Sequence, residues 1–394
     1  MQEPLTQLQH EVETELGKIL NFWITCSIDS RNGGFFGRID EDNKVYSRAP
    51  KGSVLNARIL WSFSAAGHLT KNPLYADIAT RAYDYIIKYF IDNDYGGVYW
   101  TVNVGGEPLE TKKQIYASAF AIYALSEYYR CSQNNAAKEH AINLYKTLMR
   151  HSHDSERSGF FEAFTREWQE LGDQRLSAKD ANEKKTTNTN LHVLEAFCNL
   201  FSIWPDEQLK EVIVELLSIF VSRIIDPHSG HLRLFFDPYW NHKPDVISYG
   251  HDIEASWLLQ ACAEIINDQK LVHTFRKKGI SLADAAMRGL DSDGGLWYEF
   301  DLAKNAMVHE KHWWPQAEAL VGFFNAWQVT SDTRYLDACI NTWKFICSYL
   351  LNPSGEWYWG VLPGGTPMKG EDKVGIWKCP YHNSRACMEL LKRL

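Results

Sequence analysis

The segment YGGVYW, residues 95–100, places two glycines directly before a Val-Tyr-Trp run, and this pattern decides the fold. Similar combinations of glycine and aromatic residues return five more times, at 33–37, 159–164, 230–236, 293–300 and 355–361. Successive copies lie about 65 residues apart. Each copy is typical of a turn that leads into a short extended segment. A regular spacing of this length indicates an architecture built from six repeats.

Between the copies, apolar residues recur with the spacing of one helical face. In the first stretch, for example, Leu8, Val12 and Leu16 share a face. Comparable stripes predict twelve helices, at 8–23, 54–66, 75–90, 115–129, 136–149, 187–201, 209–225, 253–266, 271–287, 315–329, 335–350 and 382–394. Two of these helical segments also resemble each other, because residues 73–86 align with residues 333–346.

Helical hairpins that each carry an aromatic turn can stack as an open superhelix or as a closed ring. The helices before each glycine pattern carry charge on one face, whereas those after it are apolar almost all round. This alternation favours closure, with an outer and an inner ring. We therefore predict an all-α fold, an (α/α)₆ barrel of six helical hairpins with short β-turn or extended segments in its loops. It forms a single domain over residues 1–394, and two polar insertions, 165–186 and 362–373, lie over its mouth.

Composition and charge exclude several classes of protein. The formal net charge is −8 and no run of lysine or arginine is present, which argues against a nucleic-acid partner. No apolar stretch reaches ~20 residues, the length of a membrane span, and the N-terminal residues lack the pattern of a secretion signal. The eight cysteines are scattered without a C-x-x-C pair. These features predict a cytoplasmic protein without a membrane partner, and the absence of an exposed apolar stripe predicts a monomer.

The helices of the predicted inner ring carry isolated polar residues near their starts, which converge at one end of the barrel. They are Arg58, Tyr116, Asn188, His192, His251, Glu254, Trp314, Glu318 and His382, with Trp377 just before the last helix. Burial in the core accounts for a lone histidine more simply than function does. Three histidines that converge from different inner helices instead predict a functional cluster.

The spacing of these residues predicts particular partners. His251 and Glu254 are three residues apart and share a helical face, so the carboxylate can accept the imidazole N–H and raise its basicity. A buried arginine needs a counter-charge, so Arg58 either faces the substrate or pairs with Glu254 or Glu318. The two tryptophans named above either pack in the core or present flat faces to a ligand.

Motifs for metals and nucleotide cofactors are missing. His309 and His312 are three residues apart, rather than the four of a zinc-binding H-E-x-x-H helix. The sequence has no glycine-rich loop with the spacing of a dinucleotide or phosphate site, and no G-x-S-x-G elbow of a serine hydrolase. We predict neither a metal nor an organic cofactor.

Several segments resemble a known family. SVLNARILW (53–61), TNTNLHVLEAF (187–197), SYGHDIEASWLL (248–259), KHWWPQAEAL (311–320) and WKCPYHNSRACMEL (377–390) are similar to the cellobiose 2-epimerase branch of the N-acylglucosamine 2-epimerase superfamily. The resemblance runs from about Phe22 to the C-terminus. It implies an (α/α)₆ barrel and a cofactor-independent isomerase that epimerises C2 of the reducing-end sugar of β-1,4-linked disaccharides such as cellobiose, lactose and mannobiose.

The same resemblance implies roles for single residues. By motif, His251 and His382 are the acid/base pair, and His192 and Arg58 stabilise an enediolate. The sugar-contacting positions are Tyr116, Asn188, Trp314 and Trp377. Glu254 resembles the partner of His251, with Glu318 as a further supporting residue.

Elementary chemistry agrees with these roles. Epimerisation at C2 opens the hemiacetal, removes the proton alpha to the aldehyde and returns a proton to the other face. Histidine, with an unperturbed pKa of about 6.5, suits both proton transfers. Two histidines can serve opposite faces, or one can serve both. A fixed cation stabilises the cis-enediolate that forms in between.

Three alternatives remain open on the sequence. In the first alternative, the protein is a monosaccharide enzyme of the same superfamily, either an N-acylglucosamine 2-epimerase or an aldose–ketose isomerase. In the second it is a glycoside hydrolase that uses Glu254 and Glu318 as its carboxylate pair. In the third it is a helical scaffold without catalytic activity.

Overall fold

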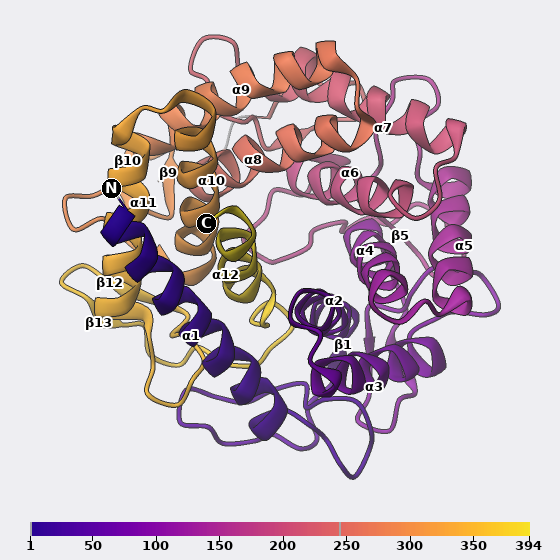
Figure 1. Cartoon of the computed structure of the whole chain (residues 1–394). Coiled ribbons are helices and arrows are strands. Elements are labelled where there is room, and N and C mark those ends of the chain that lie inside the picture. Colours follow the sequence, from indigo (N-terminus) through magenta and orange to yellow (C-terminus); the bar gives the residue numbers. More distant parts are fainter. Residues whose placement is uncertain (1, 244–245) are drawn as a thin grey trace.

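The computed structural model describes residues 2–243 and 246–394. Within these residues, twelve α-helices occur at the positions that the apolar stripes predict (Figure 1). They are α1 (Gln2–Cys26), α2 (Ser53–Thr70), α3 (Pro73–Tyr89), α4 (Ile115–Ser132), α5 (Asn135–His151), α6 (Thr187–Phe201), α7 (Glu207–Ile219), α8 (Tyr249–Ile266), α9 (Gln269–Met287), α10 (Trp313–Thr330), α11 (Thr333–Phe345) and α12 (Tyr381–Arg393). Helices α7 and α11 continue as π-helical segments, Phe220–Ile224 and Ile346–Leu350.

The helices form two concentric rings (Figure 1). α2, α4, α6, α8, α10 and α12 make up the inner ring, in which each helix contacts the next and α12 contacts α2. Inner helices are buried on every side, and in α2 all residues from Ser53 to Gly67 are buried. The outer helix α3 buries one stripe only, which includes Ile78, Ala82 and Ile86. The all-α barrel with a closed inner ring is therefore confirmed. Among the described helices, none has the length and apolar character needed to cross a membrane.

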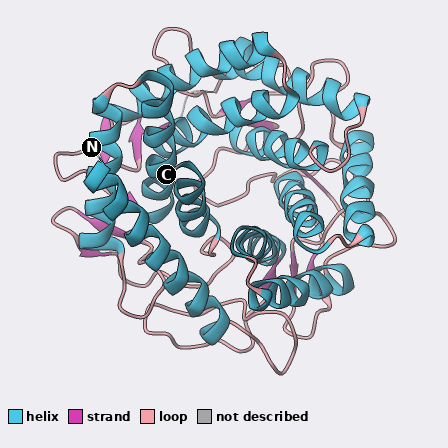
Figure 2. Ribbon diagram, viewed as in Figure 1, coloured by secondary structure: helices cyan, strands magenta, loops and turns pink. Residues whose placement is uncertain are grey.

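Short strands occupy the loops between the helices (Figure 2). They are β1 (Lys51–Gly52), β2 (Thr101–Val102), β3 (Pro108–Glu110), β4 (Lys113–Gln114), β5 (Ala163–Phe164), β6 (Lys185–Thr186), β7 (Phe235–Phe236), β8 (Val246–Ser248), β9 (Glu299–Asp301), β10 (Ala306–Val308), β11 (Lys311–His312), β12 (Gly360–Leu362) and β13 (Thr366–Pro367). The strand before an inner helix pairs antiparallel with a strand of the next repeat, as Gly52 pairs with Thr101 and Thr186 with Phe235. These small sheets tie neighbouring repeats together at one end of the barrel.

The connections at the other end are tight turns. After α2, α4, α8 and α10 the chain reverses at a residue with positive φ, namely Lys71, Gln133, Asn267 and Ser331. The next residue is an Asn or Asp that caps the outer helix, as the side chain of Asn72 accepts the N–H of Leu74. Such a cap satisfies amides that the first helical turn leaves free. Because these turns are short, the longer loops all gather at the opposite end, the mouth of the barrel.

A buried ion pair, which the sequence did not reveal, recurs in the mouth loops. Asp92 lies just before the two glycines of the second repeat, and its Oδ2 accepts from Nζ of Lys113 at 2.7 Å. Both side chains are fully buried. Asp29–Lys51 and Asp154–Lys185 repeat this arrangement, whereas the buried Lys311 pairs with Asp291 and Asp293, which are partly exposed. Each pair fastens a glycine-aromatic turn to the residues that begin an inner helix.

The two polar insertions lie in different places. Residues 175–181 of the first line the central cavity, as predicted. The second, 362–373, is described in full, and none of its residues lines that cavity; it lies at the mouth end of the barrel, in the sheet of β11, β12 and β13. It forms β13, and its end is held to the loop after α1, where Arg38 pairs with Asp372 at 2.9 Å. This ion pair keeps the segment on the rim.

Candidate active site

A cavity of about 440 Å³ opens among the starts of the inner helices. Nine of the ten residues predicted for the site line it, namely Arg58, Tyr116, Asn188, His192, His251, Glu254, Trp314, Trp377 and His382. The tenth, Glu318, bonds His382 from outside the lining. The volume is typical of sites for small molecules. The structure therefore brings together in one cavity the residues that the inner-ring pattern singled out.

Four histidines line the cavity, and the three that the sequence predicted for the site, His192, His251 and His382, are neutral at pH 7. Burial, helped by the neighbouring His192, lowers the pKa of His251 to about 3. Burial also lowers the pKa of His192. Burial, together with the nearby cations Arg58 and Arg385, holds the pKa of His382 well below its usual value. A neutral imidazole keeps a nitrogen lone pair, so each of the three can accept a proton.

Two of the histidines have carboxylate partners. Nδ1 of His382 lies 2.7 Å from Oε1 of Glu318, and Nδ1 of His192 lies 2.9 Å from Oε2 of Glu195. When Nδ1 donates its proton to a carboxylate, Nε2 carries the lone pair. In this state both imidazoles offer Nε2 as a base.

The prediction that Glu254 supports His251 is wrong. Nδ1 of His251 instead shares a hydrogen bond of 2.8 Å with the hydroxyl of Ser248, at the end of β8. Glu254 accepts from Nη2 of Arg385 at 2.8 Å. The three-residue spacing does place Glu254 and His251 on one face. However, a buried guanidinium is a stronger partner for a carboxylate than a neutral imidazole, so Glu254 is directed to α12.

Arg58 is a buried cation that faces the cavity. Its Nη2 donates to the hydroxyl of Tyr116 at 2.6 Å, and its Nη1 lies 3.8 Å from Sγ of Cys379. The guanidinium carbon lies 4.2 Å from the centre of the Phe120 ring. Within the described residues Arg58 forms no ion pair, so the predicted alternative of a glutamate partner is wrong. A buried cation held by neutral groups is suited to bind an anion.

Arg385 is a buried cation beside the cavity that the sequence did not single out. It is 1% exposed, and it donates to three carboxylates. Nη1 bonds Glu195 at 2.5 Å, and Nη2 bonds Glu254 at 2.8 Å and Glu318 at 2.6 Å. One signal could have found it, since it lies three residues after His382 and therefore on the same face of α12.

The two tryptophans predicted to meet a sugar are partly exposed in the cavity. The Trp314 ring centre lies 4.9 Å from that of His251 and 5.7 Å from that of His382. Trp377 contacts Tyr116, with ring centres 6.0 Å apart. Both indoles pack against the apolar core and also line the cavity, so part of each ring borders the space that a ligand would fill.

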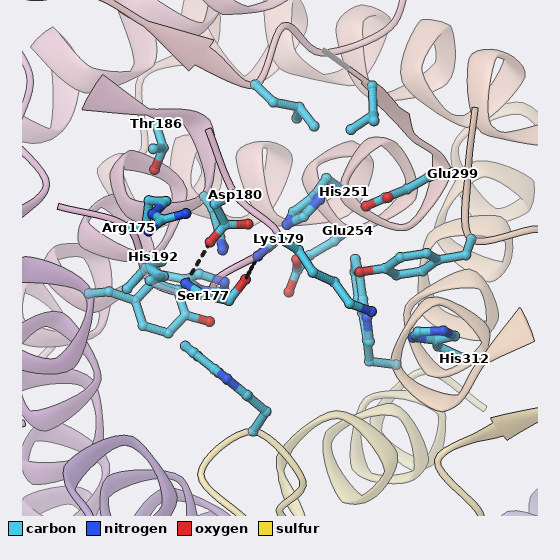
Figure 3. Close-up of a pocket in the computed structure, with 18 of the residues that line it drawn as sticks. Arg175, Ser177, Lys179, Asp180, Thr186, His192, His251, Glu254, Glu299 and His312 are labelled. Atoms are coloured by element: carbon cyan, nitrogen blue, oxygen red, sulfur yellow. Dashed lines mark hydrogen bonds between the residues drawn. The ribbon is translucent and has the colours of Figure 1, made fainter. Parts of the chain in front are cut away.

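Part of the first insertion lies beside the histidines in the cavity. Figure 3 shows Lys179 and Asp180 near His251 and Glu254. The segment is held by its own hydrogen bonds, because the N–H of Ser177 donates to Asp180 at 2.9 Å. Further lining residues that the sequence did not identify are Glu162, Thr186, Tyr298, Glu299, His312, Trp313 and Trp359. Most of them lie in or beside loops, where no regular pattern gives their position in space.

Three side chains beside the cavity could supply ligands to a metal ion, but they already bond to other groups of the protein. Glu254, Glu318 and His382 each offer an atom within 4.8 Å of the others. Arg385 donates to both carboxylates, and a metal would have to displace this cation. The three side chains therefore do not fit a resident metal.

Comparison with known proteins places the chain in a family. Residues 34–386 match the family model for N-acylglucosamine 2-epimerase. Cellobiose 2-epimerase of Bacteroides fragilis is 45% identical over 386 residues, 98% of each chain, and that of Dictyoglomus turgidum is 35% identical over 99% of this chain and 100% of its own. The structure of cellobiose 2-epimerase from Bacillus thermoamylovorans matches with a TM-score of 0.94 and 38% identity, over 99% of this chain and 100% of the other. The chain therefore belongs to the N-acylglucosamine 2-epimerase family and groups within it with the cellobiose 2-epimerases.

Proposed function

We propose that this protein epimerises C2 of the reducing-end sugar of β-1,4-linked disaccharides such as cellobiose, lactose and mannobiose, without a cofactor. One observation carries the proposal. Three neutral histidines and an arginine without a carboxylate partner among the described residues line a single cavity. These are a set of bases and a fixed cation, which deprotonation next to a carbonyl requires. Sequence similarity to cellobiose 2-epimerases supports the choice of substrate.

The proton transfers follow from the positions of His251 and His382. Opening of the hemiacetal exposes the aldehyde at C1 and makes the C2–H acidic. One of the two imidazoles accepts that proton, and the electron pair moves into a C1–C2 double bond with negative charge on O1. The two histidines approach the cavity from α8 and α12, with Trp314 beside both. The second imidazole starts neutral, so it must take up a proton from water before it can deliver one to the opposite face of C2, while the first imidazole releases its proton to water.

Arg58 and His192 stabilise the enediolate in this mechanism. Arg58 is held by Tyr116 and by aromatic rings, so its charge is already in place when the anion forms. A cation fixed in a site with little water stabilises developing charge more than a solvated cation does. His192, whose Nδ1 is engaged by Glu195, stands beside Tyr116 with ring centres 5.1 Å apart.

The positions of the carboxylates disfavour the alternative of glycoside hydrolysis. Hydrolysis requires two carboxyl groups on either side of the scissile bond. Glu254 and Glu318 instead bond the same nitrogen, Nη2 of Arg385, and Glu318 is no part of the cavity lining given by the described residues. The two groups therefore cannot flank a sugar.

The proposal extends to the state of the protein. We expect one catalytic domain of 394 residues, present as a cytoplasmic monomer. The cysteines support this location, because all eight are described by the structure and all carry free thiols. The apolar core supports a single domain, because it is continuous from Leu8 on α1 to Leu390 on α12.

Incubation of the purified protein with four sugars in D₂O tests the function. Cellobiose should yield glucosyl-mannose with deuterium at C2, and lactose should yield its C2 epimer. Mannose and N-acetylglucosamine should react far more slowly. Release of free glucose from cellobiose would identify a hydrolase instead, and conversion of the monosaccharides alone would identify the monosaccharide enzyme of the same family.

A further inference from the structure

Arg385 connects two of the three histidines through carboxylates. Oε1 of Glu318 accepts from Nη2 of Arg385 at 2.6 Å and also lies 2.7 Å from Nδ1 of His382. On the other side, Glu195 accepts from Nη1 of Arg385 through Oε1 and lies 2.9 Å from Nδ1 of His192 through Oε2. The guanidinium is thus one hydrogen-bonded residue away from both imidazoles.

The position of Arg385 is fixed on all sides. Its guanidinium carbon lies 4.9 Å from the ring centre of Trp257 and 4.3 Å from that of Tyr381. Trp257 also donates its indole N–H to Oε2 of Glu318 at 3.1 Å. Arg385 is no part of the cavity lining that the described residues form, so it does not reach a bound sugar. Its influence on the reaction must pass through other residues.

The charge of Arg385 favours the ionised form of its carboxyl partners. Burial favours the protonated form of Glu195, but Arg385 and His192 outweigh it and lower the pKa of this carboxyl to about 2. Burial raises the pKa of Glu318, and Arg385 is the strongest influence against that rise. The titratable and charged groups that face this network are Arg58 on α2, Tyr116 and Tyr123 on α4, His192 and Glu195 on α6, His251 and Glu254 on α8, Glu318 on α10, and Tyr381, His382 and Glu389 on α12.

We propose that Arg385 is a positioning residue that holds Glu318 and Glu195 as hydrogen-bond acceptors, and thereby keeps Nε2 of His382 and His192 unprotonated for the reaction. A protonated Glu318 would donate to Nδ1 of His382 and transfer the imidazole proton to Nε2. That nitrogen could then no longer accept the C2 proton. The inference rests on the proposed epimerase function for its kinetic consequences, but the state of the imidazoles is independent of it.

Substitution of Arg385 separates this role from simple packing. Arg385→Met removes the cation with little change in length, and Arg385→Lys keeps the charge but loses the fork that reaches three carboxylates. Arg393→Met is the matched control, because Arg393 lies on the same helix and bonds Asn325 and Gln328 away from the cavity. Circular dichroism and thermal unfolding establish that each variant is folded.

The kinetic readout is the deuterium exchange at C2 of cellobiose as a function of pH. Arg385→Met should lower kcat about 100-fold while KM stays within about twofold, because the substrate contacts remain. Loss of the cation also raises the pKa of His382, so the acid limb of kcat/KM should move to higher pH. Arg385→Lys should lower kcat less than Arg385→Met does, and it should leave the acid limb of kcat/KM at the wild-type pH. Arg393→Met should match the wild type.

Some kinetic outcomes would overturn the proposal. Wild-type kcat in Arg385→Met would do so, and so would a lower kcat with an unmoved acid limb, since a purely structural role predicts the latter. If Arg385→Met does not fold, Arg385→Lys decides the question. Wild-type kcat in that variant rejects the proposal, and a reduced kcat with unchanged KM supports it.

A spectroscopic readout distinguishes this inference from the proposed function. Histidine labelled with ¹⁵N reports which ring nitrogen carries the proton, and the His382 signal is identified by its loss in His382→Gln. The wild type should show Nε2 unprotonated, and Arg385→Met should show it protonated. If the wild type does not exchange the C2 hydrogen, but Nε2 is unprotonated in the wild type and protonated in Arg385→Met, the proposed function fails and the inference stands. If the wild type exchanges the C2 hydrogen and the protonation of Nε2 is the same in both proteins, the inference fails.

Discussion

The indole of Trp314 packs against the imidazole of His251, with ring centres 4.9 Å apart. This contact depends on Gly250, the residue before the histidine on α8. A Cβ at position 250 would lie 2.4 Å from the Trp314 ring and 3.0 Å from Pro315. The absence of a side chain there allows the indole to lie beside both His251 and His382.

We predict that Gly250→Ala displaces Trp314 and lowers kcat/KM of epimerisation by at least about tenfold, because a small misplacement of positioning groups weakens catalysis strongly. Gly17→Ala is the matched control, since it also lies in a helix and its Cβ would meet nothing within 4 Å. It should keep full activity and gain about 0.5–1 kcal/mol of stability. Equal activity of the two variants would show that the glycine is not needed for the site.

Removal of either proposed base should stop proton exchange at C2. We expect His251→Ala and His382→Ala each to lower the rate of deuterium incorporation by about 10²–10⁴-fold with the fold intact, because each removes a general acid/base. His10→Ala, at an exposed position on α1, serves as control. Exchange at the wild-type rate in either active-site variant would refute the assignment.

The pH dependence of kcat/KM should reflect the low pKa values of the histidines. Because burial lowers the pKa of His251 to about 3 and also lowers that of His382, both bases stay neutral as the pH falls below 6.5. The acid limb should therefore lie below pH 6.5, the ordinary value for histidine. Initial rates from pH 4 to pH 8, with stability checked at each point, measure this limb. A limb at or above pH 6.5 would contradict the prediction.

The buried ion pairs of the mouth loops should matter for stability. Lys185→Met leaves Asp154 buried without its lysine, and we expect a loss of about 3 kcal/mol in the free energy of unfolding, measured with urea. Lys392→Met breaks an exposed pair with Glu389 and should change this free energy by about 1 kcal/mol or less. Similar losses in the two variants would argue against a special role for the buried pair.

Much of the fold could be predicted because two signals coincide in each repeat. The glycine-aromatic turns give the period, and the all-round apolar helices identify the inner ring. The residues at which the helices begin and end were harder to predict from the sequence. The first helix begins at Gln2 rather than near Leu8, since its polar first turn adds little to an apolar stripe. The ion pair of Asp92 and Lys113 was missed, because 21 residues separate its members.

The sequence predicted most of the polar residues that the inner helices bring to the cavity, but it did not predict which of them bond to each other. On the inner helices the spacing H-x-x-E occurs twice, in His192–Glu195 and in His251–Glu254. Only the first pair is bonded, because Arg385 engages Glu254 instead. Sequence spacing places two groups on a common face, but competition from a third helix decides which bond forms.

The order of the inner helices along the chain has a consequence for biosynthesis. α12 carries both His382 and Arg385, closes the ring against α2, and follows the other five inner helices in sequence. As the chain leaves the ribosome, the other five inner helices therefore emerge first, as an open arc that lacks both His382 and Arg385. Competence to turn over a sugar is expected to arrive in one late step, when α12 docks, so unfinished chains stay inert towards the sugars of the cell.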